Sequence, residues 1–581
     1  MTVMGGVLAC DGVTLRPEMC VQLREALSRR KEWKVQEYRD RRAYIAKIDV
    51  GAFGETAYLQ TTDGVSALVG EALIDGGNEF QRRPRVEDLE ALRSAWRSGE
   101  LSRLQATHGS FAVIFYDAKS GRLSIASDKL GLRCVYYWRG GGLVVFATAL
   151  RVLESLPYVA KGVDLQGITE AAAFGYPLIR RTPYREIHCL DGGEIVHFDG
   201  IREWSERYWR WDTHPERGLS LDQGAELFRD RFERAVRRRL RLGESSVVAF
   251  LTGGLDSRCV VTALAELGRQ VQAVTFAAPD QLDGKIASSY AAAMGMAHHA
   301  ITAPIPAYVH PSRALPTALP QIIAAATPAP DRSAIVWSGD GGSVGLGYVY
   351  LTEEVVARMK SGALEAAVTC FLRYRRIQLP LRFLTKRAGD RLRSRLAKGM
   401  REHLSQLTSS DPTRAMYLFL LLNDQRRHLF DHLEDIDLTG IELVTPFFDS
   451  DVLEVCASVR VEEALRHRFY YRCLDAFPEA ARSVPWQAYP GHLPCPLPVP
   501  SGRYQWSETE DRQARARLLD RLAGALGDPW FPRRFVRRER LVVAQILTRL
   551  GLRDYSWLFK FVLRFHDLGK RLDTPLDFSR V

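Results

Sequence analysis

An uninterrupted apolar segment leads into a glycine turn near the middle of the chain. Residues 247–251 are apolar or small without alternation, which is typical of a strand buried on both faces of a parallel sheet. The turn 252–254 follows, and its two glycines permit a tight bend and close approach of the backbone to a ligand. Apolar residues then recur at helical spacing from Val260 to Leu267, and a second strand-like segment covers residues 271–276. The pattern predicts a strand–helix–strand unit of a parallel sheet.

The N-terminal part of the chain, up to about residue 205, shows a different pattern. Short β-type segments are separated there by Gly, Asp and Lys turns. They lie at residues 44–48, 111–116, 123–126, 134–138 and 143–147. This pattern predicts a sandwich of antiparallel sheets, which precedes the parallel unit along the chain.

The chain of 581 residues is too long for one ordinary domain, so two or more are expected. Its composition, 46% hydrophobic and 26% charged, is typical of a soluble globular protein. The formal net charge of +11 is a modest excess for this length. Basic runs at residues 237–239 and 533–540 could contact nucleic acid, an acidic peptide or ATP. No nucleic-acid-binding motif accompanies them, so solvated helix faces are the preferred interpretation and no nucleic-acid partner is expected.

The nine cysteines are scattered and form no CxxC pair, which argues against a zinc site or a disulfide framework and favours a reducing compartment. The N-terminal segment lacks a basic region followed by an apolar core, so no signal peptide is predicted. The longest apolar stretches, such as residues 417–422, are far shorter than a membrane span. We therefore expect a cytoplasmic protein without a membrane partner.

Two glycine-rich turns carry candidate chemistry. In the first, Asp256 and Ser257 open a helix directly behind the glycines, and a helix N-terminus in this setting suits a phosphate group. No Lys lies in the turn, so it is not the usual GxxxxGK[ST] nucleotide loop. The second turn lies within residues 334–347, where another apolar segment runs into residues 338–340. The sequence therefore predicts two ligand-facing turns at the ends of buried strands.

Several strings resemble motifs of the asparagine synthetase-like ATP pyrophosphatases. The string TGGLDS at residues 252–257 resembles their pyrophosphate loop, written SGGLDS in that family. Residues 440–454 resemble the family's SLEARVPFLDxxLVE, and residues 128–137 resemble its DRLGxRPLYY. The resemblance covers about residues 4 to 495.

The resemblance implies two domains. The first, residues 1–210, would be an α+β domain, an N-terminal Ntn-type αββα sandwich of the glutamine amidotransferase kind. The second, residues 211–581, would be an α/β ATP-pyrophosphatase (adenine nucleotide α-hydrolase-like) synthetase domain.

The first domain departs from the family at its nucleophile. The family uses a Cys in the string MCGI, exposed after removal of Met, whereas residues 4–7 of this chain read MGGV and place Gly5 at the Cys position. Amide hydrolysis needs a thiol or hydroxyl that a base activates. Thr2 could in principle become an N-terminal nucleophile, but nothing in the sequence favours it over an ordinary leading residue. We expect no glutaminase activity, and therefore a ready-made amine as the nucleophile of the second domain.

The resemblance also assigns roles in the second domain. Asp256 would hold Mg²⁺ on the pyrophosphate, with a helix-capping carboxylate as the alternative. Asp340 replaces a family Glu and Ser343 replaces the Asp of the second metal carboxylate, so either Asp340 takes over as a catalytic metal ligand or the metal shell uses more water. An Asx turn is the alternative for Asp340. The expected ATP-binding residues are Leu251, Thr252, Gly253, Gly254, Asp256, Ser257, Ala278, Ser338 and Gly339.

Glu442 is the candidate general base. It matches the family Glu that, in amine-using members, belongs to a pair that deprotonates the attacking amine. Such a base is needed because an ammonium group is no nucleophile until it loses a proton. A buried Glu that satisfies backbone N–H groups is the alternative.

One branch of the family matches two further features. The family Lys that stabilises the pyrophosphate leaving group is absent from residues 485–492 (PWQAYPGH), where Tyr489, His492 or a nearby Arg could substitute. This string and GDGGSVGLG at residues 339–347 resemble the lasso-peptide cyclases. That resemblance implies a macrolactam synthetase that uses ATP and Mg²⁺ to adenylate an Asp or Glu side chain of a precursor peptide. The peptide's N-terminal amine would then attack, and AMP and pyrophosphate would be released.

The partners implied by this branch are the precursor peptide, a leader-peptide protease and a leader-recognition protein. Two alternatives stay open. An asparagine synthetase or β-lactam-type synthetase would form an amide on a small substrate without a peptide. An inactive scaffold would bind a partner peptide, and the missing metal Asp and Lys support that interpretation.

Overall fold

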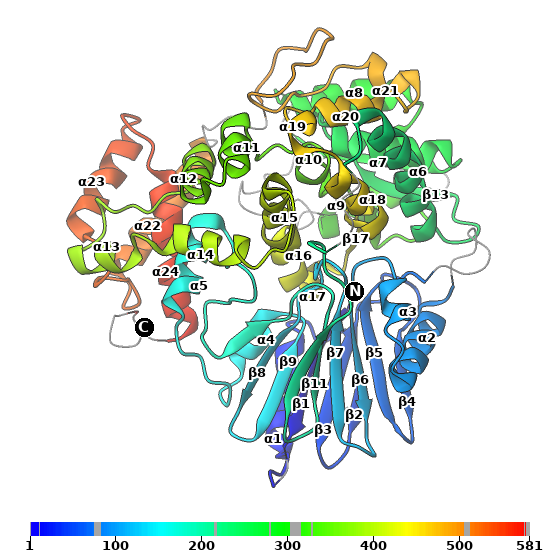
Figure 1. The fold of residues 1–581 in the computed structure, drawn as a ribbon, viewed down its shortest axis with the longest axis vertical. Helices are drawn as coiled ribbons and strands as arrows, with labels where there is room; N and C mark the ends of the chain where they lie inside the picture. The colour runs from blue at the N-terminus through cyan, green and yellow to red at the C-terminus, as the bar shows by residue number, and fades with distance from the viewer. Residues whose placement is uncertain are drawn as a thin grey trace.

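The structure is a computed structural model that describes residues 2–10, 12–74, 83–213, 218–277, 280–301, 315–326, 329–504, 512–573 and 576. The strands of the N-terminal part gather at one end of the molecule, and a helix-rich part with a second kind of sheet lies beyond them (Figure 1). Among the described helices, none combines the length and the apolar character that crossing a bilayer requires.

The N-terminal part is a sandwich of two six-stranded antiparallel sheets. The first sheet has the order β10 (Ile187–Cys189), β8 (Tyr136–Gly140), β9 (Leu143–Ala147), β1 (Thr2–Ala9), β3 (Ala43–Asp49) and β2 (Lys34–Arg39). The second has the order β12 (Glu203–Arg207), β11 (Glu194–Phe198), β7 (Arg122–Ser127), β6 (Phe111–Asp117), β5 (Gly64–Gly70) and β4 (Tyr58–Thr61). The predicted antiparallel sandwich is confirmed.

Helices cover both outer faces of the sandwich. The first sheet is covered by α1 (Pro17–Leu27) and α4 (Leu150–Ser155), and the second by α2 (Arg85–Ser98) and the short α3 (Ser102–Gln105). Helix α1 packs there because its buried residues recur at helical spacing. Between the sheets, alternate residues of facing strands form an apolar core. The predicted αββα layering is therefore present.

A five-stranded parallel sheet forms the centre of the second part, with the order β15 (Ala297–Ile301), β14 (Gln270–Phe276), β13 (Ser246–Phe250), β16 (Ile335–Trp337) and β17 (Glu442–Val444). The strands β13 and β14, with α7 (Leu255–Glu266) between them, make the predicted strand–helix–strand unit. The chain continues from β13 to β14 on one side and later returns to β16 on the other. Loops that follow β13 and β16 therefore diverge, and such a switch point is where ligands bind in open α/β sheets.

Helices of very different length make up the rest of the described structure, and only some of them flank the parallel sheet. The longest, α6 (Leu221–Arg239), begins at a capping box formed by Ser220 and Gln223 and buries Phe228 and Phe232 in the core beside the sheet. The other helical segments are α5 (Leu165–Phe174), α8 (Leu282–Ala293), α9 (Leu315–Ala325), α10 (Gly342–Gly345), α11 (Glu353–Lys360), α12 (Leu364–Tyr374), α13 (Lys386–Leu392), α14 (Arg395–Leu404), α15 (Pro412–Asn423), η2 (Gln425–Arg427), α16 (Phe430–Glu434), α17 (Ile436–Thr439), η3 (Pro446–Phe448), α18 (Ser450–Ser458), α19 (Val461–Ala464), α20 (Arg468–Leu474), α21 (Glu479–Ser483), α22 (Arg512–Gly527), α23 (Arg538–Arg549) and α24 (Ser556–Arg571).

A buried polar seam joins the two parts. Arg133 Nη2 lies 2.5 Å from Glu442 Oε2, and the side chains are 8% and 0% exposed. Arg29 Nη2 donates to Asp437 Oδ1 at 2.6 Å, and the Asp437 side chain is fully buried. Each pair joins the sandwich to the helix-rich part. Loss of Arg133 would leave the buried Glu442 without its hydrogen-bonded counterion, whereas Asp437 also pairs with Arg151 Nη2 at 3.1 Å. The predicted domain boundary, between residues 210 and 211, lies in the segment from β12 to α6 and stays a prediction.

Candidate active site

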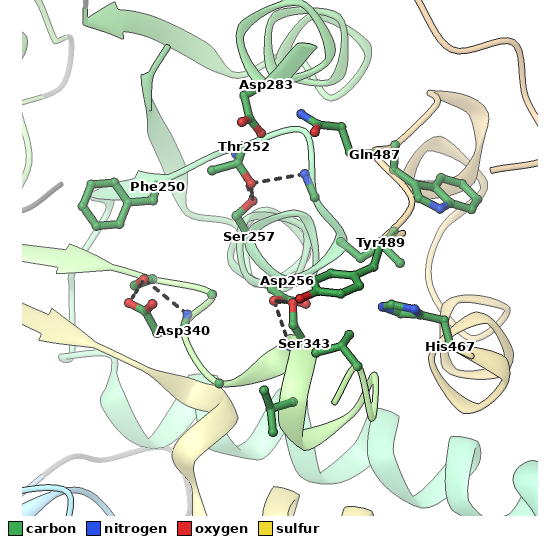
Figure 2. A pocket seen from close by; sticks show the side chains of 18 of the residues that line it. Phe250, Thr252, Asp256, Ser257, Asp283, Asp340, Ser343, His467, Gln487 and Tyr489 are labelled. Atoms are coloured by element: carbon green, nitrogen blue, oxygen red, sulfur yellow. Dashed lines mark hydrogen bonds between the residues drawn. The ribbon is translucent and has the colours of Figure 1, made fainter. Parts of the chain in front are cut away.

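A cavity of about 370 Å³ opens at the carboxyl ends of β13 and β16. Figure 2 shows Thr252, Asp256 and Ser343 near its centre, with His467 and Tyr489 coming from other segments of the chain. The cavity therefore lies in the crevice that the strand order creates, the expected place for a small-molecule site.

The first glycine turn leads directly into the N-terminus of α7 beside the cavity. Side chains hold the turn in place: Gly253 N donates to Asp283 Oδ1 at 2.8 Å, and Thr252 N donates to Ser257 Oγ at 2.9 Å. Helix α7 follows Gly254 directly, and no side chain caps its N-terminus. An anion could therefore bind the N–H groups of the first helical turn, where the helix dipole favours negative charge. This geometry suits a phosphate group.

The two glycine-rich turns approach each other too closely for side chains. A Cβ atom at Gly339 would lie 2.5 Å from the Ser257 nitrogen, and a Cβ atom at Gly342 would lie 2.6 Å from Asp256 Oδ1. Separations this short are sterically forbidden, so both positions require glycine. The glycines of the second turn thus allow it to close over the start of α7.

Asp256 is the centre of the hydrogen-bond network between the turns. Its carboxylate accepts bonds from Ser343 Oγ at 2.6 Å, from Ser343 N at 2.9 Å and from the Tyr470 hydroxyl at 2.6 Å. Burial raises the pKa of Asp256, the charge of Asp340 raises it further, and the three donors only partly oppose this. A cation beside Asp256 and Asp340 would relieve that repulsion.

Asp256 and Asp340 bring two carboxylates to one cavity, which is the donor chemistry that Mg²⁺ prefers, and their binding of the ion stays a prediction. Asp340 Oδ2 accepts a bond from Ser338 Oγ at 2.6 Å, and Asp340 Oδ1 lies 2.8 Å from His428 Nε2. Proteins commonly hold Mg²⁺ through one or two carboxylates, together with substrate phosphates and water. The two carboxylates would hold the ion next to the phosphate-binding turn, where its charge would offset that of a pyrophosphate.

The structure brings most of the predicted nucleotide-binding residues to the cavity. Leu251 is fully buried and Gly253 lies inside the turn, and neither lines the cavity. Ala278 lies outside the described residues. Their contact with ATP, like that of the lining residues, stays a prediction. The predicted residues that do line the cavity are Thr252, Gly254, Asp256, Ser257, Ser338, Gly339 and Asp340.

Glu442 does not reach the cavity. Glu442 is the first residue of β17, and it pairs with Ile335, the first residue of the parallel strand β16. The second turn follows the other end of β16. Glu442 thus lies at the opposite end of its strand from the cavity, where Arg133 binds it. Burial raises the pKa of Glu442, and the charge of Arg133 opposes this. A base must reach the amine that it deprotonates, so the geometry favours a structural role, in which Glu442 pairs with the Arg133 side chain and not with backbone N–H groups.

An aromatic wall faces the two turns, and the sequence indicated only part of it. Tyr489, a predicted substitute for the absent Lys, lines the cavity, whereas His492 packs behind the wall with its ring centroid 4.6 Å from that of His467. The string PWQAYPGH was the signal for this segment. The remaining members come from other parts of the chain without a motif that marks them: Tyr350, His467 and Tyr471.

His467 occupies an unusual position in the wall. Its φ of 65° lies in the left-handed region, which non-glycine residues adopt uncommonly. Burial lowers the pKa of His467 to about 3, and His492 contributes to the shift. The imidazole is therefore neutral at physiological pH, so it cannot supply the positive charge of the absent Lys.

Gly5, which the resemblance places at the position of the family nucleophile, has no open space beside it. Gly5 lies inside β1, paired with Ala46 of β3 and Ala147 of β9. A Cβ atom there would lie 3.0 Å from the Phe146 carbonyl oxygen and 3.2 Å from Leu27 Cδ2. The site therefore has no thiol, and apolar packing occupies the space that a side chain would need.

Comparison with known proteins agrees with the two-part architecture. The family model "Glutamine amidotransferase domain" matches residues 70–209, and "Asparagine synthase" matches residues 227–475. A solved glutamine phosphoribosylpyrophosphate amidotransferase from B. subtilis is 12% identical with a TM-score of 0.26, covering 59% of this chain and 77% of that chain. A likeness this low bears on neither fold nor function.

Three curated relatives match parts of the chain. Asparagine synthetase [glutamine-hydrolyzing] 3 of Bacillus subtilis is 28% identical over 195 residues, covering 32% of this chain and 30% of that protein. Amidase chyE of Penicillium rubens is 26% identical over 240 residues, with coverages of 39% and 34%. Putative asparagine synthetase [glutamine-hydrolyzing] 2 of Methanocaldococcus jannaschii is 24% identical over 186 residues, with coverages of 31% and 35%. The matches thus span about a third of each relative's length. With the two domain matches in this order, the chain belongs to the asparagine synthetase-like family.

Proposed function

We propose that this protein is an ATP-dependent amide-forming ligase that closes a macrolactam within a precursor peptide, as lasso-peptide cyclases do. The closed, thiol-free position of Gly5 in the sandwich, together with the uncapped N-terminus of α7 at the cavity of the other part, is the observation that carries the proposal. A synthetase without its own ammonia source needs an amine from elsewhere, and the N-terminus of a peptide is such an amine.

The reaction would have two steps. A side-chain carboxylate of the peptide attacks the α-phosphorus of ATP, which forms an acyl-adenylate and breaks the bond to pyrophosphate. The N-terminal amine then attacks the acyl carbon, an amide bond forms, AMP leaves and the amine loses a proton. The N–H groups at the start of α7 would bind the phosphates during the first step. The family's Mg²⁺, held by Asp256 and Asp340, would supply positive charge there.

The aromatic wall would serve the second step. Tyr350, Tyr471 and Tyr489 offer large, rigid aromatic surfaces in the lining of the cavity. Such surfaces hold a folded peptide and exclude water, which would otherwise hydrolyse the acyl-adenylate. The precursor peptide, a leader-peptide protease and a leader-recognition protein are the partners that this proposal requires.

A small-substrate synthetase is the second candidate, because two of the matched relatives are named asparagine synthetases. The inactive scaffold is the third, since Ser343 stands in place of a metal carboxylate and a leaving-group Lys is absent from residues 485–492.

The test supplies ATP, Mg²⁺, the leader protease and a precursor with an Asp or Glu several residues inside its core. We expect a product one water lighter than the linear core, with a ring that resists carboxypeptidase, and no product from a core in which that residue is Asn or Gln. Amidation of free aspartate without a peptide would identify a small-substrate synthetase. Binding of the peptide without loss of water would favour the scaffold.

A further inference from the structure

The helices α22, α23 and α24 form a module outside both family matches, because the second match ends at residue 475. They lie together at one side of the molecule, with α23 outermost (Figure 1). The buried face of α24 includes Phe559, Val562 and Phe565, which belong to the core cluster that also contains α5 and α22 residues. The module is thus attached to the sandwich side of the protein, away from the parallel sheet.

Helix α23 has apolar residues on two opposite faces. Leu541, Ala544 and Thr548 are buried. Two residues after each of these buried positions lies an apolar residue on the opposite side of the helix, because two residues correspond to a rotation of about 200°. This second stripe consists of residues 543, 546 and 550, which are 56%, 52% and 66% exposed. The stripe continues in Leu552, which is 71% exposed. Intramolecular packing therefore accounts for only one of the two faces.

Exposed apolar side chains are concentrated in this module. Twelve large hydrophobic residues are exposed in the part of the chain that the structure describes, and half of them lie between residues 542 and 557. Scattered exposed hydrophobics need no explanation, but a contiguous patch usually marks an interaction site.

A groove lies beside the exposed stripe. It has a volume of about 280 Å³ and shares Val543 with the stripe. Its floor is apolar and its rim is charged, with Arg540 donating to the Arg382 carbonyl. A concave apolar floor fits inserted side chains of a peptide segment. The lining residues are Arg382, Phe383, Glu539, Arg540, Val543, Ala544, Leu547 and Tyr555.

The surroundings are strongly basic. Residues 533–554 contain seven arginines and only two carboxylates, Glu539 and Asp554. Arg537 and Arg540 donate to backbone carbonyls, which satisfies their N–H groups without neutralising their charge. Arg549 lies 3.8 Å from Asp520, and both side chains are more than half exposed, so solvent screens this pair. The surface therefore favours an acidic partner.

We propose that this face, which we call the α23 surface (Val543, Ile546, Leu550, Leu552 and the adjoining groove), docks an acidic amphipathic segment of a partner protein. An apolar stripe beside a groove is the arrangement that receives an amphipathic helix through anchors at helical spacing. A second copy of this chain is a poor occupant, because a two-fold interface would set the same basic surface against itself. Nucleic acid would use the arginines but not the apolar stripe, and a bilayer could not enter the groove.

The test selects random displayed peptides on the full-length protein and removes those that also bind an Ile546→Ser/Leu550→Ser variant. We expect the selected peptides to carry Asp or Glu around apolar residues at helical spacing. Fluorescence anisotropy should show binding that weakens at least about tenfold in the variant and falls as salt rises. Ile201, 69% exposed near β12, provides the control, because Ile201→Ser should leave the affinity unchanged.

Four results would overturn the proposal. The selection could yield no peptide that distinguishes the two proteins, or only basic peptides. Duplex DNA, or vesicles of phosphatidylcholine with phosphatidylglycerol, could bind the wild-type protein and lose binding in the variant. Sedimentation could show a dimer that the variant dissociates, which would make a second copy the occupant. Equal thermal unfolding of both proteins shows that any loss of binding comes from the surface and not from the fold.

Discussion

Two glycine-containing segments, one in each part of the molecule, are built in opposite ways. Around Gly5, a strand is paired on both sides and covered by leucines, so the missing side chain is compensated by packing. Around Gly339 and Gly342, the missing side chains let two turns approach a buried carboxylate beside a cavity. The comparison teaches that the absence of a side chain means different things in different surroundings: in a packed strand it serves the fold, and beside a cavity it makes room around a charged group.

The largest expected effect concerns the seam that unites the two parts. Arg133→Met leaves Glu442 buried without its counterion and should lower the free energy of unfolding by about 3–5 kcal/mol. Thermal or urea unfolding measures this. Glu442→Gln together with Arg133→Met removes both charges, so the double variant should recover much of the loss.

The same variants examine the role of Glu442. If this residue only packs against Arg133, folded Glu442→Gln protein should form product at nearly the wild-type rate. A fall of more than about a hundredfold with ATP binding intact would instead identify it as the amine base and contradict the placement described above.

The second effect concerns the cavity. Asp256→Asn removes a negative charge that interacts with Asp340 at the start of α7, and it should slow formation of AMP and pyrophosphate at least about a hundredfold. Quench-flow or coupled assays of pyrophosphate measure the rate, and chromatography identifies the nucleotide. Production of ADP would remove the pyrophosphatase assignment. Because burial raises the pKa of Asp256, the variant should also unfold at a temperature no lower than that of the wild-type protein.

The smallest effect concerns the closed position in β1. Gly5→Cys restores the family's residue, but its Cβ would press on the Phe146 carbonyl, so we expect no release of glutamate from glutamine and a loss of about 1–2 kcal/mol in stability. Gly524 in α22 is the matched control, because nothing lies within 4 Å of its Cβ position and Gly524→Ala should stabilise the protein by about 0.5–1 kcal/mol. Glutaminase activity in the Cys variant would show that the pocket is only dormant, and the comparison would fail.

Local patterns predicted the elements that hold the site. The apolar segment ending at Leu251 and the glycines behind it were sufficient to predict β13, the turn and α7, because strand, bend and helix start are all decided within a few residues. The antiparallel sandwich followed in the same way from short segments with turn residues between them.

Long-range contacts explain what the sequence could not reveal. Glu442 matched a motif, but its partner Arg133 lies 309 residues away in the chain, and no local pattern shows which end of a three-residue strand faces the cavity. His467 lines the cavity in a left-handed backbone conformation, which is uncommon for a non-glycine residue and which no local sequence pattern predicts. The bond from Tyr470 to Asp256 spans 214 residues and is equally invisible to motif matching.

The seam has a consequence for how such a protein can change over generations. Arg29 and Arg133 neutralise buried carboxylates of the other half, so shortening the N-terminal half step by step would pass through intermediates with stranded charges. Each such intermediate would fold less stably than its ancestor, even if the discarded half did no chemistry. The sandwich would therefore be retained for its contribution to stability, whether or not it catalyses a reaction, and only coordinated substitutions on both sides of the seam would allow its loss.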